Sequence, residues 1–84
     1  MKWLAKIEVT LKKSVLDPQG AAVEKALNAL NYHNVEEVRV GKYLELYLTC
    51  AREEEAREQV KDMCNKLLTN PVIEDYEFYL SEVR

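Results

Sequence analysis

The chain has 84 residues, two cysteines and a formal net charge of −3, with 48% hydrophobic and 32% charged residues. This length allows one domain with a thin core, so we treat residues 1–84 as a single domain. The acidic balance offers no basic stripe for a phosphate backbone and therefore argues against nucleic-acid binding. No run of about 20 apolar residues is present. We accordingly expect no membrane partner, no signal peptide and a cytoplasmic location.

The two cysteines are interpreted as reduced thiols. Cys50 and Cys64 lie 14 residues apart, form no CxxC pair, and have only His33 as a further soft ligand. Three such residues are too few for a structural zinc site, which needs four ligands. We expect no metal and no cofactor, and we place Cys64 in the core as a small hydrophobic residue.

The first half of the chain has the pattern of a strand followed by a helix. Apolar and polar residues alternate from Lys2 to Lys12, which is typical of a strand with one solvent-exposed face. From Val23 the spacing changes to that of an amphipathic helix ending near Leu30, where Asn31 can adopt a left-handed cap conformation. The apolar stripe of this helix consists of Val23, Ala26, Leu27 and Leu30.

The stretch around Gly41 leaves two arrangements open. Val38 and Val40 have the same parity as the three leucines between residues 44 and 48. A two-residue turn at Gly41 and Lys42 would put the valines and the leucines on opposite faces of the sheet. Either one long strand bends at Gly41, or a three-residue loop from Gly41 to Tyr43 pairs Val40 with Leu44. The bent strand is slightly favoured.

The second half predicts a helix and a last strand. Three glutamates open an amphipathic run from Glu53 to about Thr69, and Asn70-Pro71 ends it. Alternation then predicts a strand from about residue 72 to residue 81. The core face of the helix consists of Ala56, Val60, Met63, Cys64 and Leu67. The fold class is therefore α+β, with two helices packed on one face of an antiparallel sheet in the order β-α-β(β)-α-β, as in ferredoxin-like domains.

The other face of this sheet mixes aromatic rings with charges. Tyr43, Tyr47 and Tyr79 have the outer parity, beside one lysine and three glutamates: Lys6, Glu8, Glu45 and Glu77. Such mixtures are enriched at protein interfaces, so we expect self-association through these tyrosines. Scattered exposed tyrosines without a partner are the alternative.

The turn residues indicate structure more than catalysis. Asp17 and Pro18 fit the N-cap and first position of a helix, and the carboxylate would repel a bound phosphate. Lys42 is followed by Tyr43 and no helix, so no P-loop forms. With Arg39, Lys42 could still dock on an acidic partner. The spacing shows no paired carboxylates and no Ser-His-Asp arrangement, so an enzyme acting alone is not indicated.

Three stretches together resemble the PurS family, the small subunit of phosphoribosylformylglycinamidine synthase. They are SVLDPQG at residues 14–20, VRVGKYLEL at 38–46 and CNKLLTNPVIEDY at 64–76. The similarity runs from about Ile7 to Tyr76. The chain departs from the family pattern at Asn31, where glycine is frequent, and around Cys50, where the family varies.

The resemblance implies a non-catalytic assembly subunit of an ATP-dependent, glutamine-using ligase of purine biosynthesis. In that family a PurQ-type glutaminase subunit releases ammonia, a PurL-type synthetase subunit consumes it, and PurS joins the two. Homodimers or dimers of dimers are also implied. The residues that the motifs assign to partner contacts are Asp17, Pro18, Gln19, Gly20, Arg39, Gly41, Lys42, Asn70 and Pro71.

Two other function classes remain open from the residues alone. A ferredoxin-like regulatory module that senses a small molecule usually has a glycine-bearing loop after its first strand, where this chain offers only Gly20. An acylphosphatase-like enzyme would need an arginine loop at the same place, and no suitable arginine is present there.

Overall fold

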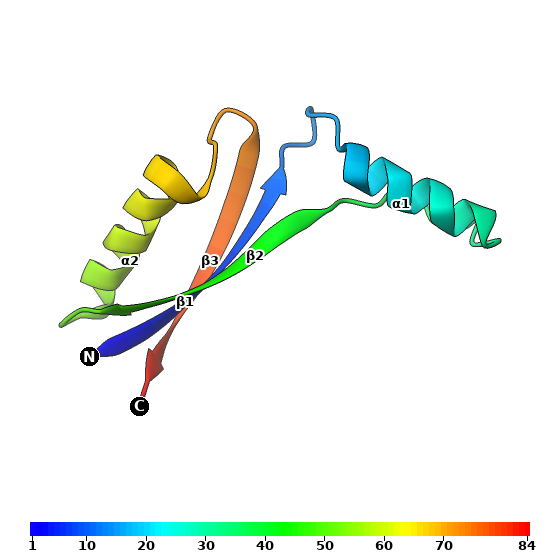
Figure 1. The fold of residues 1–84 in the computed structure, drawn as a ribbon. Coiled ribbons are helices and arrows are strands. Elements are labelled where there is room, and N and C mark those ends of the chain that lie inside the picture. Colours follow the sequence, from blue (N-terminus) through cyan, green and yellow to red (C-terminus); the bar gives the residue numbers. More distant parts are fainter.

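The computed structural model describes residues 1–84 and contains a three-stranded antiparallel sheet with two α-helices (Figure 1). The elements are β1 (Lys2–Leu11), α1 (Pro18–Ala29), β2 (Gly41–Thr49), α2 (Glu53–Met63), a π-helical turn η1 (Cys64–Leu68) and β3 (Glu74–Val83). β1 is the central strand, in the order β2-β1-β3. The predicted α+β class with an antiparallel sheet is confirmed. None of the helices combines the length and apolar character needed to cross a membrane.

The core lies between α2 and one face of the sheet. Alternate residues of β1 point to this face, and the register sets Ile7 between Leu44 of β2 and Phe78 of β3. From the helix side, Val60 and Cys64 are fully buried against it. The buried, free thiol of Cys64 is as predicted. Only 11 of the 84 residues are buried, so this single layer of contacts carries most of the packing.

Helix α1 does not cover the sheet, although the sequence pattern predicted that both helices would pack on one face. Figure 1 shows α2 along the sheet and α1 extending away beyond the end of the strands. Its predicted core residues Val23 and Leu30 are 43% and 66% exposed. The radius of gyration is 16.5 Å, against about 12 Å for a compact domain of this length. The chain is therefore extended, with one helix outside the core.

The chain around Gly41 adopts neither of the two expected pairings. β2 begins at Gly41, which pairs with Thr10 of β1, and residues 35–40 run on without a strand partner. The reason is the length of β1, which ends at Leu11 and leaves no neighbour for the preceding valines. Glycine is required at the junction because a Cβ atom at Gly41 would overlap the carbonyl oxygen of Val9.

The end of the second helix differs from the prediction in one side chain. Thr69 donates its N–H and its hydroxyl to the Cys64 carbonyl oxygen, at 3.0 and 2.8 Å, which closes a wider π turn. This turn changes which leucine faces the sheet. Leu68 packs on the core, whereas Leu67, predicted on the core face, is 83% exposed.

Candidate functional site

Most of the residues that the motifs single out gather at one end of the sheet, which we call the anchor end. Here β1 stops, and Thr10 pairs with Gly41 at the start of β2 and with Asp75 near the start of β3 (Figure 1). One pocket at this end contains five of the nine residues expected to contact partners. Its lining residues are Val9, Leu11, Asp17, Pro18, Gln19, Val40, Gly41, Lys42 and Glu74.

Asp17 ties the start of α1 to the start of β2. Its Oδ1 accepts the Gly20 N–H at 3.0 Å, which confirms the predicted N-cap, and its Oδ2 accepts the Val40 N–H at 2.8 Å. The side chain is buried. The hydrogen bond from the Gly20 N–H, and next that from the Val40 N–H, lowers the pKa of the Asp17 carboxyl below its usual value of 3.8. The nearby positive charge of Arg39 lowers this pKa as well. The carboxylate therefore joins segments 23 residues apart in the sequence.

Arg39 makes a second tie across the same junction. Its Nη2 donates to the carbonyl oxygens of Leu11 and Lys12 at 2.7 and 3.0 Å, and its Nη1 lies 3.6 Å from Glu37 Oε1. The sequence interpretation treated Arg39 as a free cation available for docking. The structure adds a structural role, because the Arg39 guanidinium joins the end of β1 to the segment before β2.

Gly20 lets the first turn of α1 approach the backbone of Val38 closely. A Cβ atom there would overlap the Val38 carbonyl oxygen and would lie 2.6 Å from Asp17 Oδ2. The first turn of α1 therefore rests directly on the backbone of residues 38–40. Together with the Asp17 and Arg39 contacts, this packing fixes the direction in which α1 leaves the sheet.

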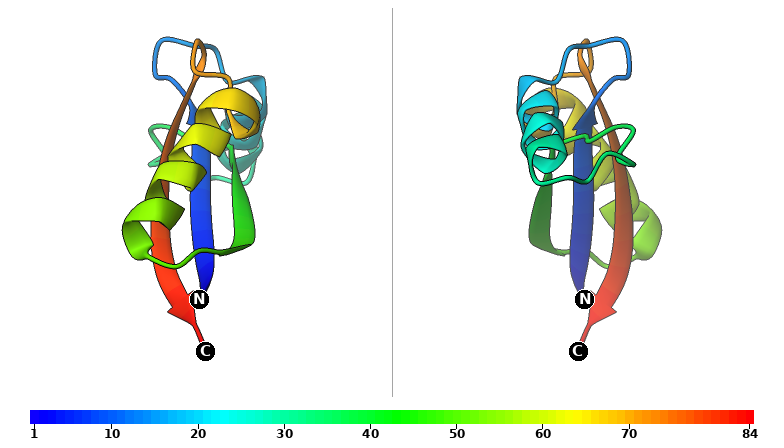
Figure 2. Two further views of the ribbon diagram at one scale, coloured as in Figure 1. Left: turned by 90° about the vertical axis from the view of Figure 1, so that its left-hand side faces the viewer. Right: turned by 90° about the vertical axis from the view of Figure 1, so that its right-hand side faces the viewer.

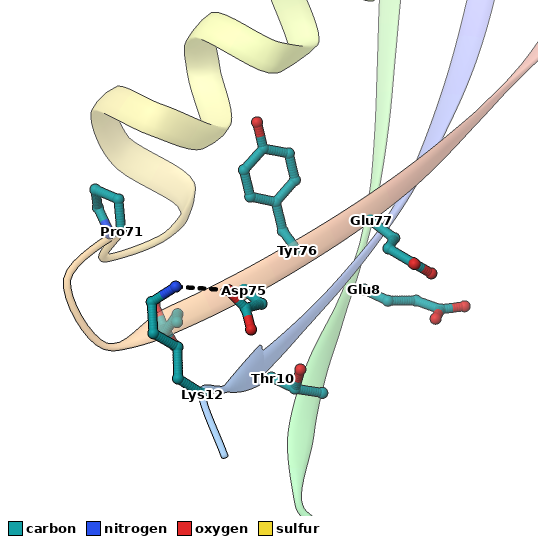
Figure 3. A pocket seen from close by; sticks show the side chains of 8 residues that line it. Glu8, Thr10, Lys12, Pro71, Asp75, Tyr76 and Glu77 are labelled. Carbon is teal, nitrogen blue, oxygen red and sulfur yellow. Dashed lines mark hydrogen bonds and ion pairs between the residues drawn. The ribbon is translucent and has the colours of Figure 1, made fainter. Parts of the chain in front are cut away.

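The turn at Asn70 and Pro71 lies at the same end of the sheet, and its Pro71 lines a different pocket. Asn70 Oδ1 accepts the Val72 N–H at 3.1 Å, and the Asn70 N–H donates to Glu74 at 2.7 Å. Figure 3 shows Pro71 in the same pocket as the ion pair of Lys12 and Asp75, whose charged atoms are 2.7 Å apart. This second pocket is lined by Glu8, Thr10, Lys12, Pro71, Glu74, Asp75, Tyr76 and Glu77.

The three tyrosines expected to mediate self-association lie exposed on the outer face. Tyr43, Tyr47 and Tyr79 are 54%, 55% and 54% exposed. The Tyr43 hydroxyl donates to Glu45 at 2.9 Å and the Tyr79 hydroxyl to Glu77 at 3.1 Å. Partial burial and then the Glu45 contact raise the pKa of Tyr43, and the Glu77 bond raises that of Tyr79. The rings are held in place with one side open to a partner.

Comparison with known proteins decides the family. The model of the PurS family, described as phosphoribosylformylglycinamidine (FGAM) synthase, matches residues 4–82. The chain belongs to the PurS family. It is 50% identical over 78 residues to the phosphoribosylformylglycinamidine synthase subunit PurS of Bacillus subtilis (strain 168), covering 93% of this chain and 92% of that one.

Solved PurS structures have the same fold. Thermus thermophilus PurS superposes with a TM-score of 0.86 at 46% identity and covers the whole of both chains. A chain of the structure of PurLQS from Thermotoga maritima gives a TM-score of 0.88 at 33% identity, over 96% of this chain and 99% of that chain. The resemblance stated from the three motifs is therefore confirmed, and PurS is a subunit of FGAM synthase.

Sequence reasoning missed two long-range contacts in this PurS chain. The bonds from Asp17 to Val40 and from Arg39 to Leu11 join the two ends of the segment that contains α1. A weak signal was present, since an aspartate cap has a second oxygen free to accept another donor. No described group of three or more histidine, cysteine or acidic side chains is placed to hold a metal. What the site can offer a partner protein is a surface of defined shape and backbone groups.

Asp17→Asn is expected to keep the helix cap but to lose the Val40 bond, because an amide has only one acceptor oxygen. The variant should unfold at lower urea concentration than the parent at neutral pH. Folding lowers the pKa of Asp17 from 3.8, so its contribution is present above that value and is lost as pH falls through the folded pKa. The difference in urea midpoint between the parent and Asp17→Asn should therefore become smaller in acid.

Asp62→Asn is the matched control, because Asp62 makes only an exposed ion pair with Lys66 at 3.0 Å. It should change the urea midpoint much less than Asp17→Asn at neutral pH. Equal midpoints for the parent and Asp17→Asn at neutral pH would contradict the role assigned to the Val40 bond.

Proposed function

We propose that this chain is the non-catalytic assembly subunit of FGAM synthase, which joins a PurL-type synthetase and a PurQ-type glutaminase in the cytoplasm so that ammonia passes between them. The observation that carries the proposal is the match, over nearly the full length of both chains, to a chain of the structure of PurLQS from Thermotoga maritima. The description of the Bacillus subtilis relative as a synthase subunit supports it.

The physical purpose of such a subunit follows from the chemistry of ammonia. Ammonia that meets bulk water is protonated and diluted, and the protonated form is not a nucleophile. Two active sites that share it must be held in a fixed relative position, which a protein with rigid exposed surfaces can provide. The anchor end of the sheet, held by the hydrogen bonds of Asp17 and Arg39, is a surface of this kind.

The proposed partner surface is the anchor end. Lys42, Gln19 and the Asn70-Pro71 turn supply exposed groups, and the Lys42 side chain is 55% exposed. Asp17, Arg39, Gly20 and Gly41 set the shape of the backbone beneath these groups through the contacts described above. Rigid, preformed surface lowers the entropic cost of docking.

The proposed self-association surface is the outer face with Tyr43, Tyr47 and Tyr79. Lys2 lies over the Tyr47 ring at 5.1 Å, and the other two rings are oriented by their bonds to glutamates. Ordered aromatic rings supply large contact area at low conformational cost. We assign this face to self-association of the chain, as a homodimer or a dimer of dimers.

The test is assembly of purified subunits, followed by size-exclusion chromatography with light scattering. The chain should co-elute with the synthetase and glutaminase subunits together. Lys42→Glu should weaken assembly about tenfold, the effect of losing roughly 1.4 kcal/mol at an interface. Lys66→Glu makes the same charge change on α2 and should have no effect. A chain that elutes alone from the mixture would overturn the proposal.

A further inference from the structure

The edge of the sheet formed by β3 is open. β3 pairs only with β1, without interruption from Glu74 to Val83. Its sequence, EDYEFYLSEV, contains no proline and no lysine, and its register with β1 has no bulge. Exposed edge strands usually carry one of these features, because each hinders the addition of another strand. β3 carries none of them, so its edge is free to accept a strand.

The outward backbone groups of β3 can be assigned to particular residues. The Lys12 N–H donates to the Ile73 carbonyl oxygen at 2.8 Å, which continues the β1–β3 register and makes this a hydrogen-bonded pair. Hydrogen-bonded and non-hydrogen-bonded pairs alternate along an antiparallel ladder. Tyr76, Phe78 and Leu80 therefore direct their N–H and C=O groups away from β1. None of these groups has a backbone partner elsewhere in the chain.

A groove lies between α2 and this edge. The left view of Figure 2 shows α2 running obliquely across β3. The half-buried rings of Tyr76 and Phe78 are stacked with their centres 6.4 Å apart, and the Arg57 guanidinium lies 5.8 Å from the centre of the Phe78 ring. The groove can take apolar side chains, whereas Arg57 and Lys61 would repel basic ones. Its lining residues are Arg57, Lys61, Tyr76, Glu77, Phe78 and Tyr79.

The outer side of the same edge has the opposite charge. Asp75 and Glu77 of β3 are exposed on this side. Glu77 lies directly opposite Glu8 of β1, and the two side chains project to the same side in Figure 3. Like charges directly opposite each other destabilise a sheet. A basic side chain on an added strand would be the next neighbour of Glu77 and would relieve this repulsion.

We propose that the β3 edge binds an extended segment of another protein as a fourth, antiparallel strand, and that this segment alternates basic with apolar side chains. The three outward residues of β3 supply the main-chain hydrogen bonds, as in other complexes formed by strand addition. Apolar side chains of the segment enter the groove beside Tyr76 and Phe78. Its basic side chains lie next to Asp75 and Glu77, where opposite charges stabilise cross-strand pairs.

The charge of β3 selects against a second copy of this chain as the occupant. The strand sequence EDYEFYLSEV includes four acidic residues and no basic one. Two such strands side by side would bring their carboxylates together without a compensating cation. The inference goes beyond the proposed function and does not depend on it, because its test uses the purified chain alone. Failure of either would leave the other standing.

The first test measures, by fluorescence anisotropy, the binding of a labelled seven-residue peptide in which valine and arginine alternate, with valine at both ends. When its central arginine lies opposite Glu77, its valines face the groove and a second arginine lies opposite Asp75. The peptide should bind saturably and about tenfold more tightly than the same peptide with glutamate in place of arginine. Added salt should reduce this difference. Absence of binding, or equal affinity for the two peptides, would overturn the proposal.

The second test shows whether main-chain bonds carry the binding. In an antiparallel pair the residues opposite Tyr76, Phe78 and Leu80 donate to β3, and in this register they are valines of the peptide. N-methylation of the two inner valines should therefore abolish binding. N-methylation of two arginines is the matched control and should leave saturable binding, because their N–H groups point away from β3. Any other pattern of binding by the two methylated peptides would overturn antiparallel strand addition.

The third test changes the charge on the outer side of the edge. Glu77→Lys should lower the affinity for the arginine peptide about tenfold, because an attraction becomes a repulsion. The variant should remain folded, since the new lysine lies opposite Glu8. Equal affinity of the parent and Glu77→Lys would contradict the proposed placement of the basic side chains.

Glu45→Lys is the matched control for this variant. It makes the same charge change on the same face and likewise removes the acceptor of a tyrosine hydroxyl, but it lies on β2 at the other edge of the sheet. It should bind the arginine peptide like the parent, and circular dichroism checks that both variants are folded. If Glu77→Lys instead changed the mass of the chain in light scattering and left peptide affinity unaltered, the edge would belong to a second copy and the proposal would fail.

Discussion

Ile7→Ala is expected to lower the free energy of unfolding by about 2–5 kcal/mol, the cost of leaving a cavity in a packed core. Ile7 is fully buried at the middle of the central strand, between Leu44 and Phe78 and below Val60. Domains of this kind are stable by only about 5–15 kcal/mol, so the loss is a large share of the total. Urea unfolding followed by circular dichroism measures it.

Leu67→Ala is the control for this prediction, since it removes a similar side chain from a site that is 83% exposed. Its effect should stay within about 0.5 kcal/mol. Comparable losses for the two variants would show that α2 and η1 sit on the sheet in a different rotation from the one described.

Gly20→Ala is expected to destabilise the protein by about 1–3 kcal/mol, because the added methyl group overlaps the Val38 carbonyl oxygen and crowds Asp17. The sign of the change in stability is informative. In an open helix the same change would stabilise by roughly 0.5–1 kcal/mol, since alanine is the better helix former. Thermal or urea unfolding distinguishes the two outcomes directly.

Ala22→Gly tests the same helix without the close approach, because Ala22 is exposed in α1. It should cost no more than about 1 kcal/mol, through helix propensity alone. If Gly20→Ala were more stable than the parent, the first turn of α1 could not rest on residues 38–40 as the structure has it.

Features set by local chemistry were predictable from the sequence. The alternation in β1 and the glutamate-led start of α2 depend on neighbours within a few residues, and both elements form close to their predicted bounds. Asp17 caps α1, and Asn31 takes the predicted left-handed conformation with φ of 72°. The last strand runs from Glu74 to Val83, shifted by two residues from the prediction.

Features set by distant parts of the chain were not predictable. An amphipathic pattern shows that a helix has a face to bury, but it does not say which surface covers that face, so α1 was wrongly placed on its own sheet. The hydrogen bonds from Val40 to Asp17 and from Arg39 to Leu11 join residues that only the folded chain brings together. The π turn at Cys64 likewise exchanged the roles of Leu67 and Leu68 without a signal in their spacing.

The assembly role is tested by the turnover of reconstituted synthetase and glutaminase subunits, with this chain added in increasing amounts. Glutamine-driven synthesis should be absent without the chain and rise to a plateau as it is added, while synthesis driven by free ammonia stays level. Full glutamine-driven turnover by the two other subunits alone would contradict it.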